Sequence, residues 1–306
     1  MIRWPALAFA ALLSTLALAQ GFPERPVRIV VPLTPGGSPD TIARSVAASL
    51  QSVWTQPVVV ENRPGGSQNI GADLVAKSAP DGHTWLLAPD NVFSVNPHLG
   101  KQPFDPFADF IAVTQLARIQ FLLVVHPSLP VNTVSELIAY AKARPGELNH
   151  GSSGNGSPQH LGAAMFQLLT GTKLNHVPYK GAAPAVADLL PGRIQVWIGA
   201  ANTLLPHIKD GRLRLLGDSP TIAQSVPGYS LDPWLGLFVP AKTPAPVVQR
   251  IHAEVTKIVN GAELKSKLGA QGIIIDTNSP EAFARFIRED HARWGKVIRE
   301  AGIKGE

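Results

Sequence analysis

The sequence predicts an α/β protein built from two lobes. Apolar, strand-like runs alternate with helix-like segments from Val27 to the C-terminal region, and the alternation starts again after His126. Such alternation is typical of sheets covered by helices on both faces. A chain of 306 residues is also long for one hydrophobic core. We therefore expect a mostly parallel sheet in each lobe.

The first part of the chain shows three strands, and a helix follows each of the first two. VRIVVP is a typical buried strand, and the helix after it carries Ile42, Val46 and Leu50 on one face. Glycine and proline clusters separate the segments. The expected strands are 27–32, 58–61 and 84–88, and the expected helices are 39–52 and 70–79.

The remainder of the chain repeats this pattern with shorter strands. Leu161, Met165 and Leu168 recur at helical spacing in one segment, and 245–260 is a long amphipathic segment. The expected strands are 121–125, 148–151, 173–177, 194–198, 213–216, 234–239 and 273–276. The expected helices are 134–143, 157–169, 184–190, 204–210, 245–260 and 280–301.

The N-terminus predicts secretion. Arg3 precedes an apolar run from Ala6 to Leu16, and Ala17-Leu18-Ala19 fits a cleavage site. The run is shorter than the roughly 20 residues that span a bilayer. We expect a signal peptide at 1–19, a first lobe at 20–123 plus 238–306, and a second lobe at 124–237. The strands at 121–125 and 234–239 are the expected crossings between lobes.

Composition narrows the possible functions. Hydrophobic residues make up 45% and charged residues 16% of the chain, which argues against disorder. The net charge is +5, with Lys and Arg scattered rather than clustered, so we expect no nucleic-acid partner. The chain has no cysteine, which excludes disulfides and thiolate metal sites. We expect a monomer without metal or cofactor.

Two similar phrases, one in each predicted lobe, give the strongest functional signal. Gly37-Ser38-Pro39-Asp40 and Gly156-Ser157-Pro158-Gln159 each follow a strand and open a helix. Glycine permits close backbone approach, serine caps helices, and proline suits the first turn. Helix N-termini attract anions. Two lobes that grip one small anion are the resulting hypothesis, although ordinary well-capped strand-to-helix loops would look similar.

Further candidates lie close to these loops or at strand ends. Asp40 and His160 each fall in the first helical turn, as ligand groups or as local caps and packing. Open α/β sheets bind ligands beyond the carboxyl ends of their strands. The other candidates of this kind are Asn69, Asn91, Tyr179 and Lys180, the last of which has a solvated charge as its alternative.

Enzyme motifs fit poorly. G-x-S-x-G fails at Asn155, G-x-G-x-x-G fails at Gln159, and no phosphate-binding P-loop or H-E-x-x-H occurs. A secreted hydrolase that uses Ser152 or Ser153, with Ser152, His160 and Asp40 as a triad, remains an alternative, because triads assemble from distant positions. We expect no enzymatic activity.

Longer phrases carry a family resemblance over essentially all of the mature chain. They include RPVRIVVPLTPGGSPDTIAR, QPVVVENRPGGSQNIGADLVAKSAPDGHTWLLAP, VVHPSLPVNTVSELIAYAKARPGELNHGSSGNGSPQHL, NHVPYKGAAPAVADLL and FIREDHARWGKVIREAGIK. The chain resembles the Bug-type extracytoplasmic solute receptors, the substrate-binding subunits of tripartite tricarboxylate transporters.

The resemblance implies a two-lobed periplasmic-binding-protein fold of type II, the Venus-flytrap kind. It implies a periplasmic receptor that captures a small organic anion, a carboxylate, for membrane transporter subunits. A ligand-sensing input protein for a signalling system is the alternative. The resemblance places carboxylate binding at Pro35, Gly36, Gly37, Ser38 and Asp40 and, in the other lobe, at Ser152, Ser153, Gly154, Ser157 and His160. Tyr179 and Lys180 match a V-P-Y-K-G phrase of the family.

The chain also departs from the family pattern. Trp197 and Ala201 stand where the family usually has aspartates, and the segment from Gly217 to Thr221 is shorter. The third strand ends in Pro89-Asp90 rather than in a serine- or threonine-bearing loop. We expect these positions to lie near the cleft and to alter the identity of the ligand or the strength of its binding.

Overall fold

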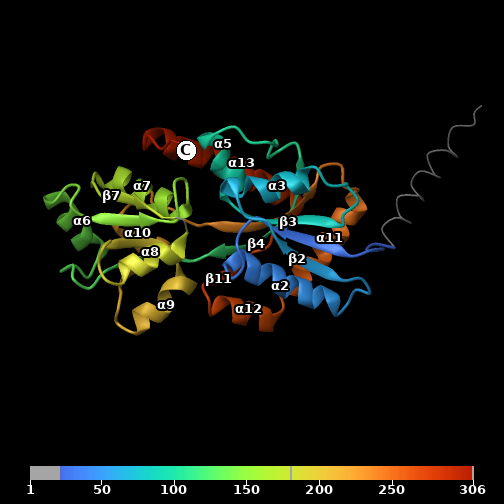
Figure 1. The fold of residues 1–306 in the computed structure, drawn as a ribbon, viewed down its shortest axis with the longest axis horizontal. Coiled ribbons are helices and arrows are strands. Elements are labelled where there is room, and N and C mark those ends of the chain that lie inside the picture. The colour runs from blue at the N-terminus through green and yellow to red at the C-terminus, as the bar shows by residue number, and fades with distance from the viewer. Residues whose placement is uncertain (1–20, 180, 305–306) are drawn as a thin grey trace, which may run out of the picture.

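The computed structural model describes residues 21–179 and 181–304, in which the strands form two separate sheets. The predicted signal peptide and Lys180 lie outside these residues. Figure 1 shows the two sheets, each with its own helices, side by side along the longest axis of the molecule. Among the described residues, no helix has both the length and the apolar character needed to cross a membrane.

The first sheet contains six strands in the order β11-β4-β10-β3-β1-β2. Its strands are β1 (Val27–Val31), β2 (Val58–Asn62), β3 (Thr84–Pro89), β4 (Phe110–Ile119), β10 (Trp234–Pro240) and β11 (Ile273–Ile275). The helices of this half are α2 (Ser38–Gln51), α3 (Asn69–Ala76), α4 (Asn91–Ser94), α5 (Asn96–Leu99), α11 (Ala245–Val259), α12 (Ala262–Gly269) and α13 (Pro280–Glu300), with a 3₁₀ turn η1 at Gly66–Gln68.

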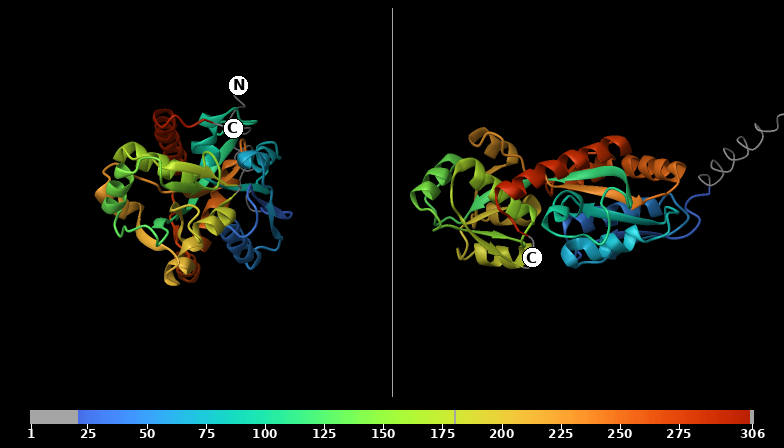
Figure 2. Two further views of the ribbon diagram at one scale, coloured as in Figure 1. Left: turned by 60° about the vertical axis from the view of Figure 1, so that its left-hand side comes forward. Right: turned by 90° about the horizontal axis from the view of Figure 1, so that it is seen from above.

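The second sheet contains five strands in the order β7-β6-β8-β5-β9. Its strands are β5 (Phe121–Val125), β6 (Asn149–Ser152), β7 (Asn175–Pro178), β8 (Val196–Ala200) and β9 (Arg214–Asp218). Its helices are α6 (Val134–Ala143), α7 (Pro158–Thr170), α8 (Ala182–Leu189), α9 (Ala201–Lys209) and α10 (Ser219–Ser225). Viewed from above, the long helix α13 runs along the first half toward the junction (Figure 2).

The expectation of mostly parallel sheets was wrong. Only the pairs β1–β2 and β1–β3 are parallel in the first sheet, and β6–β7 and β6–β8 in the second. Strand β10 pairs antiparallel with both β3 and β4, and β5 pairs antiparallel with both β8 and β9. Parallel neighbours need a crossover, usually a helix, whereas β10 and β5 enter directly from the other sheet and are free of that requirement.

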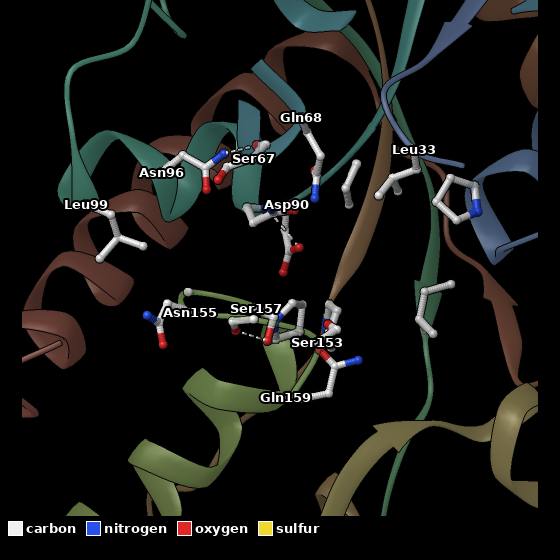
Figure 3. A pocket seen from close by; sticks show the side chains of 18 of the residues that line it. Leu33, Ser67, Gln68, Asp90, Asn96, Leu99, Ser153, Asn155, Ser157 and Gln159 are labelled. Atoms are coloured by element: carbon white, nitrogen blue, oxygen red, sulfur yellow. Dashed lines mark hydrogen bonds between the residues drawn. The ribbon is translucent and has the colours of Figure 1, made fainter. Parts of the chain in front are cut away.

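The chain passes between the sheets at two places. Gln120 alone separates β4 from β5, and residues 226–233 lead from α10 back to β10. Strands β5 and β10 therefore each stay within one sheet, and the connection precedes each of them. This arrangement brings the carboxyl end of β3 and the amino end of α7 to the same gap (Figures 1 and 3).

Apolar periodicity explains the elements that the sequence predicted. In β1, Val27, Ile29 and Val31 are fully buried, and α2 covers them with Ile42, Val46 and Leu50. Burial of about 25 cal/mol per Å² of apolar surface drives this packing. Strand β4 escaped prediction because Thr114 and Gln115 interrupt its apolar run. Both are buried, and Asn278 satisfies them: Thr114 Oγ1 donates to its carbonyl, and its side-chain oxygen accepts the Gln115 N–H.

A substitution at Gly71 tests how tightly α3 packs against Pro32, which follows β1, and Arg63, which follows β2. A Cβ at this position would lie 2.9 Å from the Arg63 carbonyl oxygen and 2.9 Å from Pro32 Cβ. Gly71→Ala should lower the free energy of unfolding by about 1–3 kcal/mol, because overpacking outweighs the gain in helix propensity. Urea denaturation measures the change. The control is Gly269→Ala in α12, where no atom lies within 4 Å of the new Cβ. It should stabilise by about 0.4–1 kcal/mol, and equal effects of both variants would contradict the packing argument.

Candidate functional site

A cavity of about 690 Å³ lies between the two sheets. Figure 3 shows its walls, with β3, α5 and the segment around Ser67 on one side and the Ser153–Gln159 segment on the other. The junction strands contribute Ile119, Phe121 and Trp234. A cavity of this size suits a small organic molecule.

Most of the polar side chains on the cavity wall are uncharged. Asp90 and Lys101 are the lining residues, among those described, whose side chains belong to the acidic and basic types. Carboxamide side chains supply both donors and acceptors around the cavity, and they belong to Gln68, Asn69, Asn91, Asn96, Gln102, Asn155 and Gln159. The side-chain oxygens of Gln68 and Asn69 are buried and have no hydrogen-bond partner among the described residues. Such a wall suits a polar ligand.

The first predicted loop reaches the cavity only in part. Ser38 lines the cavity, as do the predicted Asn69 and Asn91, but Pro35, Gly36, Gly37 and Asp40 are not among its lining residues. Asp40 is 5% exposed and faces its own loop. It accepts hydrogen bonds from Gly36 N at 3.0 Å, Asn62 Nδ2 at 3.0 Å and Arg44 Nε at 2.9 Å. Although burial raises the pKa of Asp40, these bonds hold it below its ordinary value.

The second predicted loop divides in the same way. Ser153, Gly154, Ser157 and Tyr179 line the cavity. Ser152 and His160 are not lining residues, and Lys180 lies outside the described residues. Ser152 is fully buried, and its hydroxyl lies 2.6 Å from His176 Nε2.

His160 supports the second loop from behind. Its Nδ1 accepts the Gly156 N–H at 3.2 Å, which makes this nitrogen the unprotonated one. The His160 ring stacks on His176 with centroids 3.9 Å apart, and His176 stacks on His150 at 4.8 Å. Burial and then the neighbouring imidazoles lower the pKa of His150 to about 3 and of His160 to about 4. The stack is therefore neutral at ordinary pH.

The two loops are held by the same kind of hydrogen bond, from a glycine N–H to a side chain four residues later. The glycines that make these bonds differ by one residue from the pair that the repeated phrase aligns. Gly36 donates to Asp40, and Gly156 donates to His160, each four residues further on. Both glycines have positive φ, 92° and 71°. The repeated phrase aligns Gly37 with Gly156, but Gly36 is the structural equivalent of Gly156. As a result Ser38 lies inside its helix, whereas Ser157 is a true N-cap whose hydroxyl accepts the His160 N–H.

Tyr179 lines the cavity with its ring, and its hydroxyl group is already hydrogen-bonded to another residue. Its phenol donates to Asp188 Oδ2 at 2.9 Å. Burial and the Asp188 carboxylate raise the pKa of Tyr179 to about 12. The phenol therefore stays protonated and bonded to α8, and its ring shapes the cavity.

Sequence reasoning missed several lining residues. Gln159 follows Pro158 in the repeated phrase, and its Oε1 accepts from Ser153 Oγ at 2.8 Å. This bond turns the Gln159 NH₂ group away from Ser153, as Figure 3 shows. Helices α4 and α5 were not predicted, so Asn96 and the nearby Gln102 had no predicted element to place them at the cavity. Ser67 and Gln68 have positive φ, 51° and 76°, which propensity rules do not anticipate.

Acid should destabilise the protein through the histidine stack. The folded pKa values of His150 and His160 lie below 6.5, so the unfolded chain binds more protons between about pH 6.5 and 4. The free energy of unfolding should therefore fall as the pH drops through this range. Urea denaturation at stepped pH measures it. His160→Gln, whose carboxamide oxygen still accepts from Gly156, should lose less stability on acidification. An equally steep loss in that variant would contradict the assignment.

Comparison with known proteins agrees with this architecture. Residues 42–303 match the tripartite tricarboxylate transporter family receptor. Protein BugT of Bordetella pertussis is 34% identical over 303 residues, covering 94% of this chain and 92% of BugT. The solved structure of R. palustris Rpa4515 with adipate is 36% identical, with a TM-score of 0.85, and covers 93% of this chain and 100% of that one.

A second solved structure supports the same relationship. MatC (Rpa3494) from Rhodopseudomonas palustris with bound malate is 27% identical, with a TM-score of 0.79, and covers 90% of this chain and 100% of that one. Both the sequence match and the fold extend over both sheets and the cavity between them. The chain belongs to the tripartite tricarboxylate transporter receptor family, the Bug-type solute receptors.

Proposed function

We propose that the chain is a periplasmic receptor that captures a small organic carboxylate in the cavity between its lobes. It delivers this ligand to the membrane subunits of a tripartite tricarboxylate transporter. The observation that carries the proposal is the cavity itself. Segments of both halves line it with side chains that can donate hydrogen bonds, such as Asn69 and Asn91 in one half and Gln159 in the other. The solved structures of Rpa4515 with adipate and of MatC with bound malate support the ligand class.

The amino ends of α2 and α7 supply the attraction for an anion. These helices contain 14 and 13 residues, and their first residues, Ser38 and Pro158, line the cavity. The partial positive charge of a helix N-terminus stabilises an anion by about 0.3–1 kcal/mol at an exposed site and more where water is excluded. The Gln159 amide adds a donor at the same place, whereas the Ser157 hydroxyl donates to Gly154 O at 2.7 Å and so fixes the loop. The ligand needs no arginine.

The ligand site in this proposal is smaller than the set of residues predicted from sequence. The binding residues are Ser38, Asn69, Asn91, Ser153, Gly154, Ser157 and Tyr179, joined by Gln159. Pro35, Gly36, Gly37, Asp40, Ser152 and His160 shape the two loops from behind. Asp40 and His160 hold Gly36 and Gly156 in place and so fix where the helix ends point.

Ligand capture proceeds by rotation of one lobe toward the other. The predicted lobe bounds, 20–123 plus 238–306 and 124–237, shift by a few residues, because β5 begins at Phe121 in the second sheet and β10 begins at Trp234 in the first. Gln120 and residues 226–233 connect the sheets. Contacts across the gap are both polar and apolar: Asn202 Nδ2 lies 3.4 Å from Ser38 Oγ, and the Leu99 side chain of α5 packs against Gly156. Ligand contacts with both lobes favour closure as far as they are stronger in the closed form.

Binding without chemistry fits the side chains better than hydrolysis. The postulated triad is not assembled, because Ser152 pairs with His176 and Asp40 is bonded to Gly36, Asn62 and Arg44. Ser153 donates to Gln159 rather than to a base. We propose a monomer that acts without metal or cofactor and is not an enzyme.

A panel of organic acids tests the function. Adipate, malate, other dicarboxylates and tricarboxylates, and matched neutral diamides are added to the purified protein, and the melting temperature is measured. A carboxylate at 100 times its Kd stabilises the folded state by about 2.7 kcal/mol. Titration calorimetry then gives the affinity. If the neutral diamides stabilise the protein and the acids do not, the proposed ligand class is wrong.

Gln159→Glu tests the donor role of Gln159 within the site. The substitution keeps the size of the side chain but replaces its NH₂ donor with a carboxylate oxygen. Loss of a hydrogen bond to a charged group costs about 1.5–3 kcal/mol, so carboxylate affinity should fall at least tenfold in calorimetry. Gln224→Glu on the exposed side of α10 makes the same chemical change outside the cavity and should bind like the wild type. Equal affinities for both variants would remove Gln159 from the site.

A further inference from the structure

A buried carboxyl group faces the cavity from the end of β3. Asp90 is 3% exposed and lines the cavity wall. Its main-chain N–H donates to Trp234 O at 3.0 Å, and its Oδ1 accepts from Asn91 N at 2.8 Å. Figure 3 shows the carboxyl pointing across the gap toward Ser153 and Ser157. An acidic side chain in this place is unexpected in a receptor for anions.

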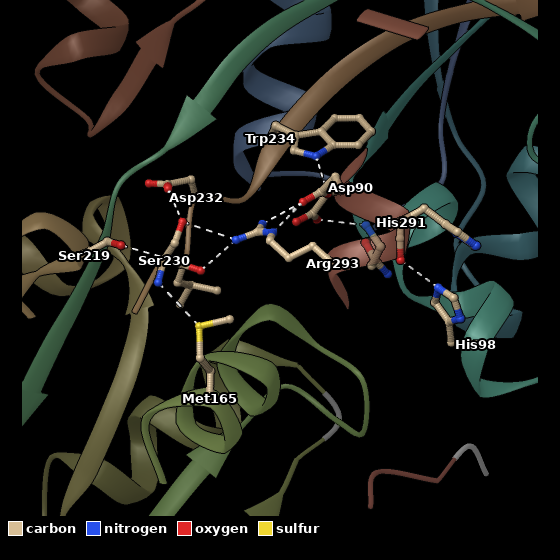
Figure 4. Close-up of polar contacts among 12 residues, drawn as sticks. Asp90, His98, Met165, Ser219, Ser230, Asp232, Trp234, His291 and Arg293 are labelled. Carbon is tan, nitrogen blue, oxygen red and sulfur yellow. Dashed lines mark hydrogen bonds and ion pairs between the residues drawn. The ribbon is translucent and has the colours of Figure 1, made fainter. Parts of the chain in front are cut away.

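A second buried carboxylate, that of Asp290, lies near Asp90 and forms an ion pair with the Arg293 guanidinium. Asp290 of α13 is 3% exposed. It accepts from Trp234 Nε1 at 2.9 Å and from Arg293 Nη2 at 2.6 Å. The Arg293 guanidinium also donates to Ser230 O at 3.0 Å. Figure 4 shows Arg293, Trp234 and Ser230 of this network close to Asp90.

The surroundings disfavour a charge on Asp90. Burial, and then the negative charge of Asp290, raise the pKa of Asp90 to about 8, against the hydrogen bond from Asn91 and the attraction of Arg293. Two buried carboxylates served by one guanidinium do not both ionise at neutral pH. Other charged or titratable groups on the elements around Asp90 include Asp73 and Lys77 of α3, His98 of α5, Lys101, Asp232, and His291 of α13.

We propose that Asp90 is an un-ionised carboxylic acid that donates a hydrogen bond to a carboxylate of the bound ligand. The proposal rests on the proposed function, because it needs an anionic ligand. An ionised Asp90 would repel such a ligand at close range, whereas a carboxylic O–H donated to a carboxylate forms a short, strong hydrogen bond. The ligand carboxylate then lies between Asp90 and the Ser153–Ser157 segment.

If Asp90 donates this hydrogen bond, the affinity for a carboxylate ligand depends on pH. Only the protonated form of Asp90 donates, so carboxylate binding is strongest in acidic and neutral solution. Above the pKa of about 8, each pH unit removes a factor of ten from the competent population. A ligand that presented an ammonium group to Asp90 would show the opposite trend, because it would select the ionised form.

Calorimetry with adipate and malate between pH 6 and 9.5 tests the hydrogen bond. Wild-type affinity should fall about tenfold per unit above pH 8, and binding at high pH should take up a proton. Asp90→Asn has nearly the same size and offers an NH₂ donor that does not titrate, so its affinity should change less than twofold over this range. Asp232→Asn removes a nearby carboxyl group that does not line the cavity and should keep the wild-type pH profile.

Unfolding without ligand tests the protonation state separately. Asp90 has a folded pKa above its unfolded value near 3.8, so the folded state binds the extra proton between about pH 4 and 8. The stability of the wild type relative to Asp90→Asn should therefore fall as the pH rises through this range. Urea denaturation of the two proteins at matched pH values measures the difference.

Each outcome decides a separate part of the proposal. A pH-dependent wild type and a flat Asp90→Asn variant support it. Wild-type affinity that stays constant or rises with pH overturns the hydrogen bond but leaves the receptor function intact. If no carboxylate probe binds at any pH, the receptor function and the hydrogen bond both fail. Stability curves of the wild type and Asp90→Asn that run parallel from pH 4 to 8 overturn the un-ionised state of Asp90.

Discussion

The cavity depends on one repeated local constraint, in which a side chain in the first turn of a helix accepts the N–H of the glycine four residues before it. Asp40 does this for Gly36 in one half, and His160 does it for Gly156 in the other. Each bond bends a strand-to-helix loop so that the start of its helix reaches the cavity. The side chains that hold the loops are thus withdrawn from the ligand, and small residues, hydroxyls and amides remain to face it.

The side chain that accepts the glycine N–H is ionised in one half and neutral in the other. Asp40 is an acceptor because hydrogen bonds keep it ionised, and Arg44 lies beside it to balance the charge. His160 is an acceptor because burial within the stack keeps it neutral. Neither device places a fixed positive charge on the cavity wall, and Lys101 is the cationic side chain among the described lining residues. Main-chain dipoles and neutral donors therefore dominate the field that a ligand meets.

Much of the fold could be predicted from sequence, because apolar runs such as Val27–Val31 and helix caps such as Ser157 act locally. Strand β4 could not, since its buried Thr114 and Gln115 depend on Asn278, far away in the chain. Of the residues predicted to bind the ligand, seven line one cavity, and ligand contact by them stays a prediction: Ser38, Asn69, Asn91, Ser153, Gly154, Ser157 and Tyr179. Asp90 and Gln159 were not assigned, because their roles arise from Asp290 and Ser153 rather than from their own phrases.

Gln120 restricts how the two halves can move. As the one residue between β4 and β5, it keeps the facing ends of these strands within about 7–8 Å of each other. Its main-chain N–H donates to Gly272 O, and its carbonyl accepts from Ala201 N, so it is hydrogen-bonded to both halves. Sliding of one half past the other would break this pivot, whereas turning about it would not. A rotation about Gln120 would change the width of the cavity while Ile119 and Phe121, which line it, remain neighbours.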